Sequence, residues 1–150
     1  MPLLSGVPAG DDRADGRLFD KMWISLFLAG LNGAVAMVVL SFAAHSAERI
    51  LPPEQIALIR RGAELHLWHA LALLGVAALS ARCAGVRWFA LATIAFQVGI
   101  VLFSGSLYWL GLMGPNTLGP FGLATPLGGL ALIVGWASLA GAGLSRRRHH

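Results

Sequence analysis

Four long apolar stretches account for most of the chain, and shorter polar or glycine-rich connections separate them. The stretches cover residues 22–44, 65–81, 88–113 and 126–144. A helix needs about 20 predominantly apolar residues to cross a bilayer. The first and third stretches reach this length, and the other two are slightly shorter or carry polar interruptions. The pattern predicts an all-α integral membrane protein with four transmembrane helices in an antiparallel bundle.

Composition supports this interpretation. Of the 150 residues, 57% are hydrophobic and 12% are charged, whereas an ordinary soluble domain has about 25% charged residues. This deficit excludes most classes of soluble enzyme. We expect a four-helix membrane domain at residues 21–144, a disordered or surface-lying head at residues 1–20, and a basic cytoplasmic tail at residues 145–150.

Basic residues are divided unequally between the two sides of the predicted bundle. Four spans place both termini on one side. That side holds Arg13, Arg17, Lys21, Arg82, Arg87, Arg146, Arg147 and Arg148, and the other side holds Arg49, Arg60 and Arg61. Because Lys and Arg favour the cytoplasmic side, we expect a bacterial inner-membrane protein with cytoplasmic N- and C-termini. This distribution also explains the net charge of +4 without a nucleic-acid-binding surface.

The connection at residues 45–64 is the one long polar connection in the sequence. From Glu54 onward we expect an amphipathic segment that lies at the membrane surface or continues straight into the second span. Within it, Glu64 is either a surface carboxylate paired with Arg60 or Arg61, or a buried proton carrier. We favour the surface pair, because burying a lone carboxylate costs several kcal/mol.

Small residues in the first span predict a close contact between helices. Ala29 and Gly33 form one pair at a spacing of four residues, and Gly30 and Ala34 form a second pair on the adjoining face. Such pairs let neighbouring backbones approach closely inside membranes. We therefore expect the first span to pack against another helix through these faces.

Polar side chains in or beside the spans are the candidate functional positions. Spacings of seven and four residues place Gln97, Ser104 and Tyr108 on one helix face, which we expect to face the bundle interior. Neither serine of the third span lies in a Gly-x-Ser-x-Gly motif, so we predict no catalytic residue. The polar intramembrane candidates are Asn32, Glu64, Gln97, Ser104, Ser106 and Tyr108.

Three histidines are candidate ligands of a metal or a haem. His66 and His69 are three residues apart on one predicted helix, so both imidazoles can address a common point, and His45 ends the preceding span. Three histidines can bind a transition metal, and two from different helices can ligate a haem. Because no carboxylate accompanies them at a ligand spacing, we predict no metal site and no cofactor.

Several short motifs carry a resemblance to a known family. Residues 43–45 read Ala-Ala-His, residues 68–73 read Trp-His-Ala-Leu-Ala-Leu, residues 102–108 read Leu-Phe-Ser-Gly-Ser-Leu-Tyr, and residues 124–129 read Ala-Thr-Pro-Leu-Gly-Gly, followed by Gly-Trp at 135–136. In this order they resemble the YgdD-like family of small four-span membrane proteins, domain of unknown function 423. The sequence departs from that family at Ala43, where relatives carry Gly, and at His66, where they usually carry Gln. The resemblance implies a four-helix inner-membrane protein and no established activity.

Three functions remain open from the sequence. We place first a structural or accessory subunit, not an enzyme, that acts through helix–helix contacts in a homo-oligomer or a larger membrane complex. The alternative is an oligomeric small-solute or ion transporter or channel, because four short spans give one chain little interior. The third is a metal- or haem-binding redox membrane protein that uses His45, His66 and His69. In all three the lipid bilayer is a partner.

Overall fold

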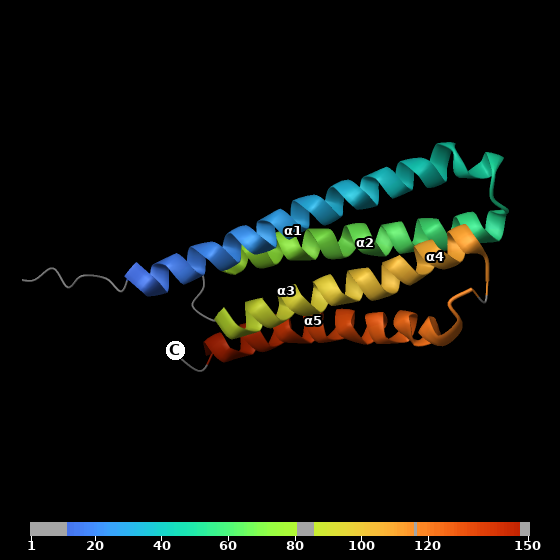
Figure 1. Cartoon of the computed structure of the whole chain (residues 1–150). Coiled ribbons are helices and arrows are strands. Elements are labelled where there is room, and N and C mark those ends of the chain that lie inside the picture. The colour runs from blue at the N-terminus through green and yellow to red at the C-terminus, as the bar shows by residue number, and fades with distance from the viewer. Residues whose placement is uncertain (1–11, 81–85, 116, 148–150) are drawn as a thin grey trace, which may run out of the picture.

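Helices make up nearly all of the part of the chain that the computed structural model describes, which comprises residues 12–80, 86–115 and 117–147 (Figure 1). No strand occurs within these residues. In chain order the elements are α1 (Asp12–His45), the 3-10 turn η1 (Ala47–Arg49), α2 (Pro53–Ser80), α3 (Val86–Gly99), the π-helical turn η2 (Ile100–Ser104), α4 (Gly105–Met113), the 3-10 turn η3 (Gly119–Leu123) and α5 (Ala124–Arg147).

Four segments are long and apolar enough to cross a membrane. They are Met22–His45, Pro53–Ser80, Arg87–Met113 and Gly119–Ser145. The third consists of α3, η2 and α4, which form one nearly continuous rod (Figure 1). The predicted all-α architecture with four membrane-spanning helices is therefore confirmed.

The second span begins earlier than predicted. α2 starts at Pro53 rather than at residue 65, so the polar lead-in continues straight into the span. Ile56, Ile59 and Ala63 are buried at helical spacing, and this apolar face explains why residues 53–64 remain helical.

Parts of the predicted head and tail are helical. α1 begins at Asp12, so residues 12–20 of the predicted head continue the first helix. α5 extends to Arg147, into the predicted tail. Residues 1–11 and 148–150 of the predicted head and tail lie outside the described residues.

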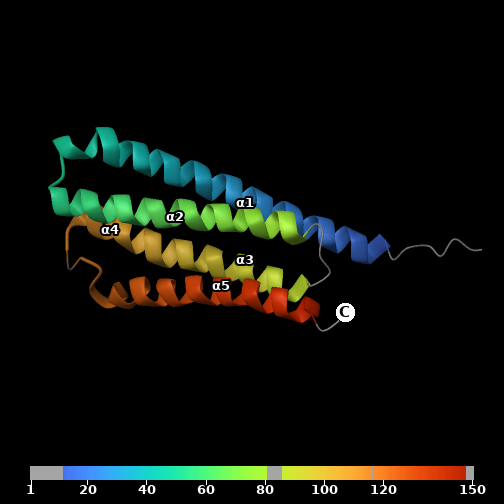
Figure 2. The same cartoon turned by 180° about the vertical axis from the view of Figure 1, so that it is seen from behind.

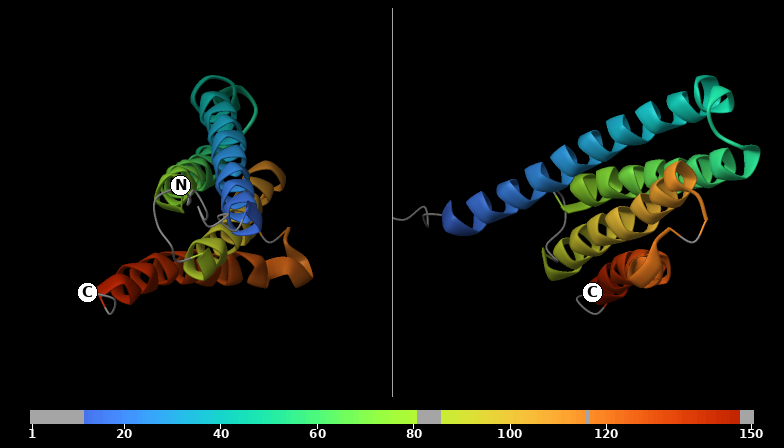
Figure 3. Two further views of the ribbon diagram at one scale, coloured as in Figure 1. Left: turned by 90° about the vertical axis from the view of Figure 1, so that its left-hand side faces the viewer. Right: turned by 45° about the vertical axis from the view of Figure 1, so that its right-hand side comes forward.

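The spans run antiparallel, and the start of α1 and the end of α5 lie at the same end of the bundle (Figures 1 and 2). α1 packs mainly on α2, α2 also packs on α4, and α5 packs on α3 and η2. The core includes Leu73 and Val76 of α2, Phe96 of α3 and Leu132 of α5. Viewed from the end, α2 and α3 separate α1 from α5 (Figure 3), and these two outer spans are the least buried.

Glycines allow close helix contacts at several crossings. A Cβ atom added at Gly62 would lie 3.0 Å from the Tyr108 ring, and one added at Gly128 would meet the backbone nitrogen of Phe103. Glycine is therefore required for the observed spacing of α5 from η2, and a larger residue at Gly62 would require the Tyr108 ring to shift slightly.

The small residues of the first span behave differently from these glycines. A Cβ atom added at Gly30 or Gly33 would meet nothing within 4 Å among the described residues. Gly30 and Ala34 are exposed, and Ala29 is buried. The predicted contact through Gly30 and Ala34 is therefore not made within the described chain, because this face of α1 is turned away from α2.

Candidate functional site

A buried chain of hydrogen bonds connects one side chain from each of α1, α2, α3 and α4. His66 lies at its centre, with Nδ1 3.0 Å from the Tyr108 hydroxyl and Nε2 2.9 Å from Asn32 Oδ1. The Asn32 Nδ2 group donates to Gln97 Oε1 at 2.9 Å and to the Leu28 carbonyl at 2.7 Å. We call Asn32, His66, Gln97 and Tyr108 the polar network.

The acceptor types fix the direction of these bonds. The Leu28 carbonyl only accepts, so it identifies the Asn32 nitrogen, and the Asn32 oxygen therefore faces His66. His66 must then carry its proton on Nε2 to donate to that oxygen. In the neutral imidazole, Nδ1 accepts from the Tyr108 hydroxyl. The network thus has one order of donors, from Tyr108 through His66 and Asn32 to Gln97.

This order limits what the network can do chemically. A proton relay needs each member to accept a proton on one atom and release one from another. The carboxamides of Asn32 and Gln97 donate and accept hydrogen bonds but do not titrate. The network therefore holds four helical segments in register and does not form a continuous proton path.

His69 connects α2 with α5 in a second, separate arrangement. Its Nδ1 lies 2.7 Å from the Leu65 carbonyl, and the Trp136 indole donates to its Nε2 at 3.3 Å. A carbonyl only accepts and an indole N–H only donates, so His69 is neutral with its proton on Nδ1. The Phe96 ring packs against both partners, 5.6 Å from His69 and 5.3 Å from Trp136 between ring centroids.

Comparisons with known proteins identify the family to which this bundle belongs. A family model described as protein of unknown function (DUF423) matches residues 40–129. The chain belongs to the DUF423 family. This match includes three members of the polar network, His66, Gln97 and Tyr108. The matched range begins after Asn32 and ends before Trp136.

Individual relatives of this DUF423 chain are named as membrane proteins. The UPF0382 membrane protein YwdK of Bacillus subtilis is 36% identical over 115 residues, covering 77% of this chain and 91% of the relative. The UPF0382 inner membrane protein YgdD of Escherichia coli is 33% identical over 112 residues, covering 75% and 82%. A UPF0382 membrane protein of Haemophilus influenzae is 35% identical over 115 residues, covering 77% and 89%. No solved structure matches.

The DUF423 chain does not bring the three candidate histidines together. His45 is exposed at the end of α1, whereas His66 and His69 are buried and bond to different helices. Among the described residues, no group of three His, Cys, Asp or Glu side chains could hold a metal ion. The expectation that His66 and His69 address a common point is wrong, since His66 bonds to Asn32 of α1 and Tyr108 of α4, whereas His69 bonds to the Leu65 carbonyl and to Trp136 of α5.

Glu64 also lies outside the polar network. Its side chain is exposed on α2, and so are those of Arg60 and Arg61. Within the described part of the chain Glu64 forms no ion pair, so the predicted pair with Arg60 or Arg61 is not made. Exposed pairs of this kind contribute little, which explains why the helix does not hold the side chains together.

The serines of the third span differ in their partners. Ser106 Oγ donates to the Phe103 carbonyl at 2.8 Å and lies 2.7 Å from Thr125 Oγ1, which joins α4 to α5. Ser104 is 1% exposed, and its Oγ has no hydrogen-bond partner among the described residues.

Ser104 lies in the π turn η2. A serine in a helix commonly bonds to the carbonyl four residues earlier, which for Ser104 is the carbonyl of Ile100. In η2 that carbonyl accepts from the backbone N–H of Gly105. Ser104 therefore faces the interior but does not join Gln97 and Tyr108 in the polar network.

Trp136, Ser25, Thr93 and Thr125 were not among the predicted site residues. Ser25 Oγ lies 2.9 Å from Thr93 Oγ1 and so links α1 to α3. Each of these side chains lies on a predominantly apolar helix. Its partner depends on how the helices are rotated against each other, which the sequence pattern does not reveal.

Proposed function

We propose that this DUF423 protein is a structural or accessory subunit of a membrane complex and acts through helix–helix contacts. The saturation of its polar interior is the observation that carries the proposal. Apart from Ser104, the buried polar side chains of the described residues bond to each other or to helix carbonyls. A catalytic or transport site would need such groups to face a substrate.

The contact surface in this proposal is the outer face of α1. Gly62, Gly99 and Gly128 press against a neighbouring helix, whereas Gly30 has open space beside it, as do Gly33, Gly75, Gly105 and Gly143. Gly30 and Ala34 together allow close approach of a helix. We expect a helix of a partner protein, or of a second copy, to pack here. Gly30 would then contact a neighbouring helix, as Gly62, Gly99 and Gly128 do inside the bundle.

A pair of substitutions tests this surface. Gly30→Leu places a large side chain where the partner helix would pack, and we expect loss of in-cell cross-links from α1 to the partner. Gly75→Leu is the matched control, because an added Cβ there also meets nothing within 4 Å and the substitution lies on α2. Equal loss in both variants, or unchanged cross-links in Gly30→Leu, would contradict the proposal.

The orientation belongs to the same proposal. The basic residues favour cytoplasmic N- and C-termini, and the common end of α1 and α5 in Figure 1 is compatible with this arrangement. Reporters that work only in the cytoplasm should be active when they are fused to either terminus, and reporters that work only in the periplasm should be inactive. A periplasmic signal from either fusion would contradict the orientation.

An oligomeric small-solute or ion transporter is the second candidate, and Ser104 is the observation that favours it. A buried hydroxyl without a protein partner inside a membrane span can serve a passing polar solute. Under this alternative, Gln97→Ala and Tyr108→Ala should abolish uptake into reconstituted vesicles. Under the accessory proposal, vesicles containing this protein alone take up no solute.

A further inference from the structure

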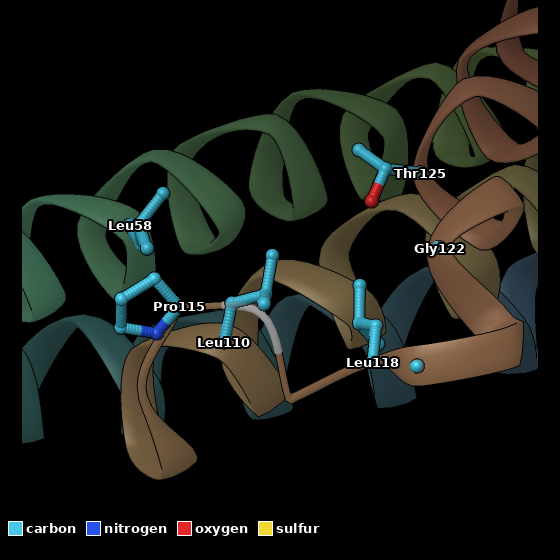
Figure 4. Close-up of a pocket in the computed structure, with 7 residues that line it drawn as sticks. Leu58, Leu110, Pro115, Leu118, Gly122 and Thr125 are labelled. Atoms are coloured by element: carbon cyan, nitrogen blue, oxygen red, sulfur yellow. The ribbon is translucent and has the colours of Figure 1, made fainter.

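An open apolar hollow lies at the end of the bundle opposite to the described chain ends. It has a volume of about 450 Å³ and lies between α2, α4, η3 and the start of α5 (Figure 4). Leu58 and Leu110 contribute side chains, and the α4–α5 connection closes one side with Pro115 and Leu118. The one hydroxyl in its lining, that of Thr125, bonds to Ser106. The hollow therefore offers an apolar surface and few groups that would hold a polar solute.

Aromatic residues place this hollow near the membrane surface. Trp109 is exposed, and its indole N–H donates to the Thr117 carbonyl at 3.4 Å. Phe121 in η3 is also exposed. Tryptophan side chains collect at the level of lipid headgroups. The hollow thus lies where the headgroup and the upper acyl chains of a lipid meet the protein.

Two opposite charges lie on the side of α2 that carries Leu58, outside the lining of the hollow itself. Glu54 precedes Leu58 by four residues and Arg61 follows it by three, so all three lie on one side of the helix. Both charged side chains are exposed and make no ion pair within the described residues. Glu54 lies in the first turn of α2 and is nearer to the water than Arg61.

The order of these charges corresponds to that of a zwitterionic headgroup. Helical side chains tilt toward the N-terminus of their helix, so Arg61 leans outward, toward the level of Leu58. A long arginine can also keep its charge at the interface while its stem contacts apolar groups. In phosphatidylethanolamine the phosphate lies next to the acyl chains and the ammonium lies farther out. Arg61 is therefore in position for the phosphate, and Glu54 for the ammonium.

We propose that this hollow binds a phospholipid with an ethanolamine headgroup. The apolar lining holds the upper part of an acyl chain, Arg61 binds the phosphate, and Glu54 accepts hydrogen bonds from the ammonium. Phosphatidylcholine lacks the ammonium N–H donors, and phosphatidylglycerol lacks the cation. The site therefore prefers phosphatidylethanolamine over both. This inference does not depend on the proposed accessory function.

Native mass spectrometry of the full chain in mild detergent tests the proposal. The three lipids, with identical acyl chains, are titrated separately, and we expect phosphatidylethanolamine to bind about fivefold more tightly than the other two. Arg61→Gln should weaken binding of all three lipids, because the phosphate is common to them. Glu54→Gln should remove the preference for ethanolamine and leave the affinity for phosphatidylglycerol unchanged.

Matched controls lie on the other side of α2. Arg60 and Glu48 line a different hollow together with Ile56, so Arg60→Gln and Glu48→Gln should leave both affinity and preference unchanged. All four substituted positions are exposed, and circular dichroism checks that each variant is folded. Equal binding of the three lipids by the unmodified chain would overturn the proposal. An equal effect of Arg60→Gln and Arg61→Gln would also overturn it.

Discussion

Replacing Asn32 by leucine should destabilise the bundle more than any other single polar-to-apolar change in the first span. Asn32 joins α1 to both α2 and α3 through His66 and Gln97. Leucine is similar in size and apolar, so the substitution removes the hydrogen bonds without opening a large cavity. The measured quantity is the free energy of unfolding.

The expected magnitude follows from the lost bonds. Hydrogen bonds between membrane helices contribute about 0.6 kcal/mol each on average and up to about 1.7 kcal/mol. Losing two of them removes about 1 to 3 kcal/mol. The Nε2–H group of His66 then remains buried without an acceptor, which costs about 1 to 3 kcal/mol more. We expect a total destabilisation of about 2 to 4 kcal/mol, because these contributions overlap.

Reversible unfolding in mixed detergent micelles, followed by circular dichroism, measures this difference. Ser41→Leu is the control, since Ser41 lies on the same helix and is exposed. The double variant Asn32→Leu/His66→Leu completes a thermodynamic cycle. It should lose about 1 kcal/mol less than the sum of the single variants, because it leaves no donor of His66 unpaired. Equal stability of Asn32→Leu and Ser41→Leu, or strict additivity in the cycle, would refute the reasoning.

Three further predictions concern individual contacts. Gly128→Ala should lower stability by about 1 to 3 kcal/mol, because the added Cβ meets the backbone of Phe103; a thermal shift no larger than that of Gly75→Ala would contradict this. Ser104→Ala should maintain or raise the melting temperature, because its Oγ has no protein partner, while Ser138→Ala should lower it by removing the 2.7 Å bond to the Val134 carbonyl. Trp136→Phe should cost about 0.6 kcal/mol in the unfolding assay by removing the bond to His69, and a neutral effect would show that this bond contributes nothing.

The sequence was sufficient to predict the spans because their signal is local. A run of about 20 apolar residues identifies a transmembrane helix whatever its neighbours are, and four such runs were correctly expected. Whether the segment from Glu54 lies on the membrane surface or continues straight into the second span was left open, because Arg60, Arg61 and Glu64 interrupt the apolar run. The buried face at Ile56 and Ile59 continues beneath these charges.

The candidate site was only partly predictable, because its contacts join helices that are distant in sequence. Gln97 and Tyr108 were correctly expected to face the interior, and Asn32 was one of the polar intramembrane candidates. That His66 bonds to Asn32 depends on the rotation of α1 against α2. Ser104 was also correctly expected to face the interior, where it is 1% exposed, but its Oγ bonds to none of the described residues.

Nitrogen NMR of the protein with isotopically labelled histidine tests the polar interior most directly. The imidazole nitrogen shifts report which ring atom carries the proton. The structure predicts opposite neutral tautomers for two histidines three residues apart, with the proton on Nε2 in His66 and on Nδ1 in His69. The His66 signals should change in Asn32→Leu, and the His69 signals should change in Trp136→Phe. Identical tautomers, or rapid exchange of both rings with water, would contradict the claim that these groups bond to each other inside the bundle.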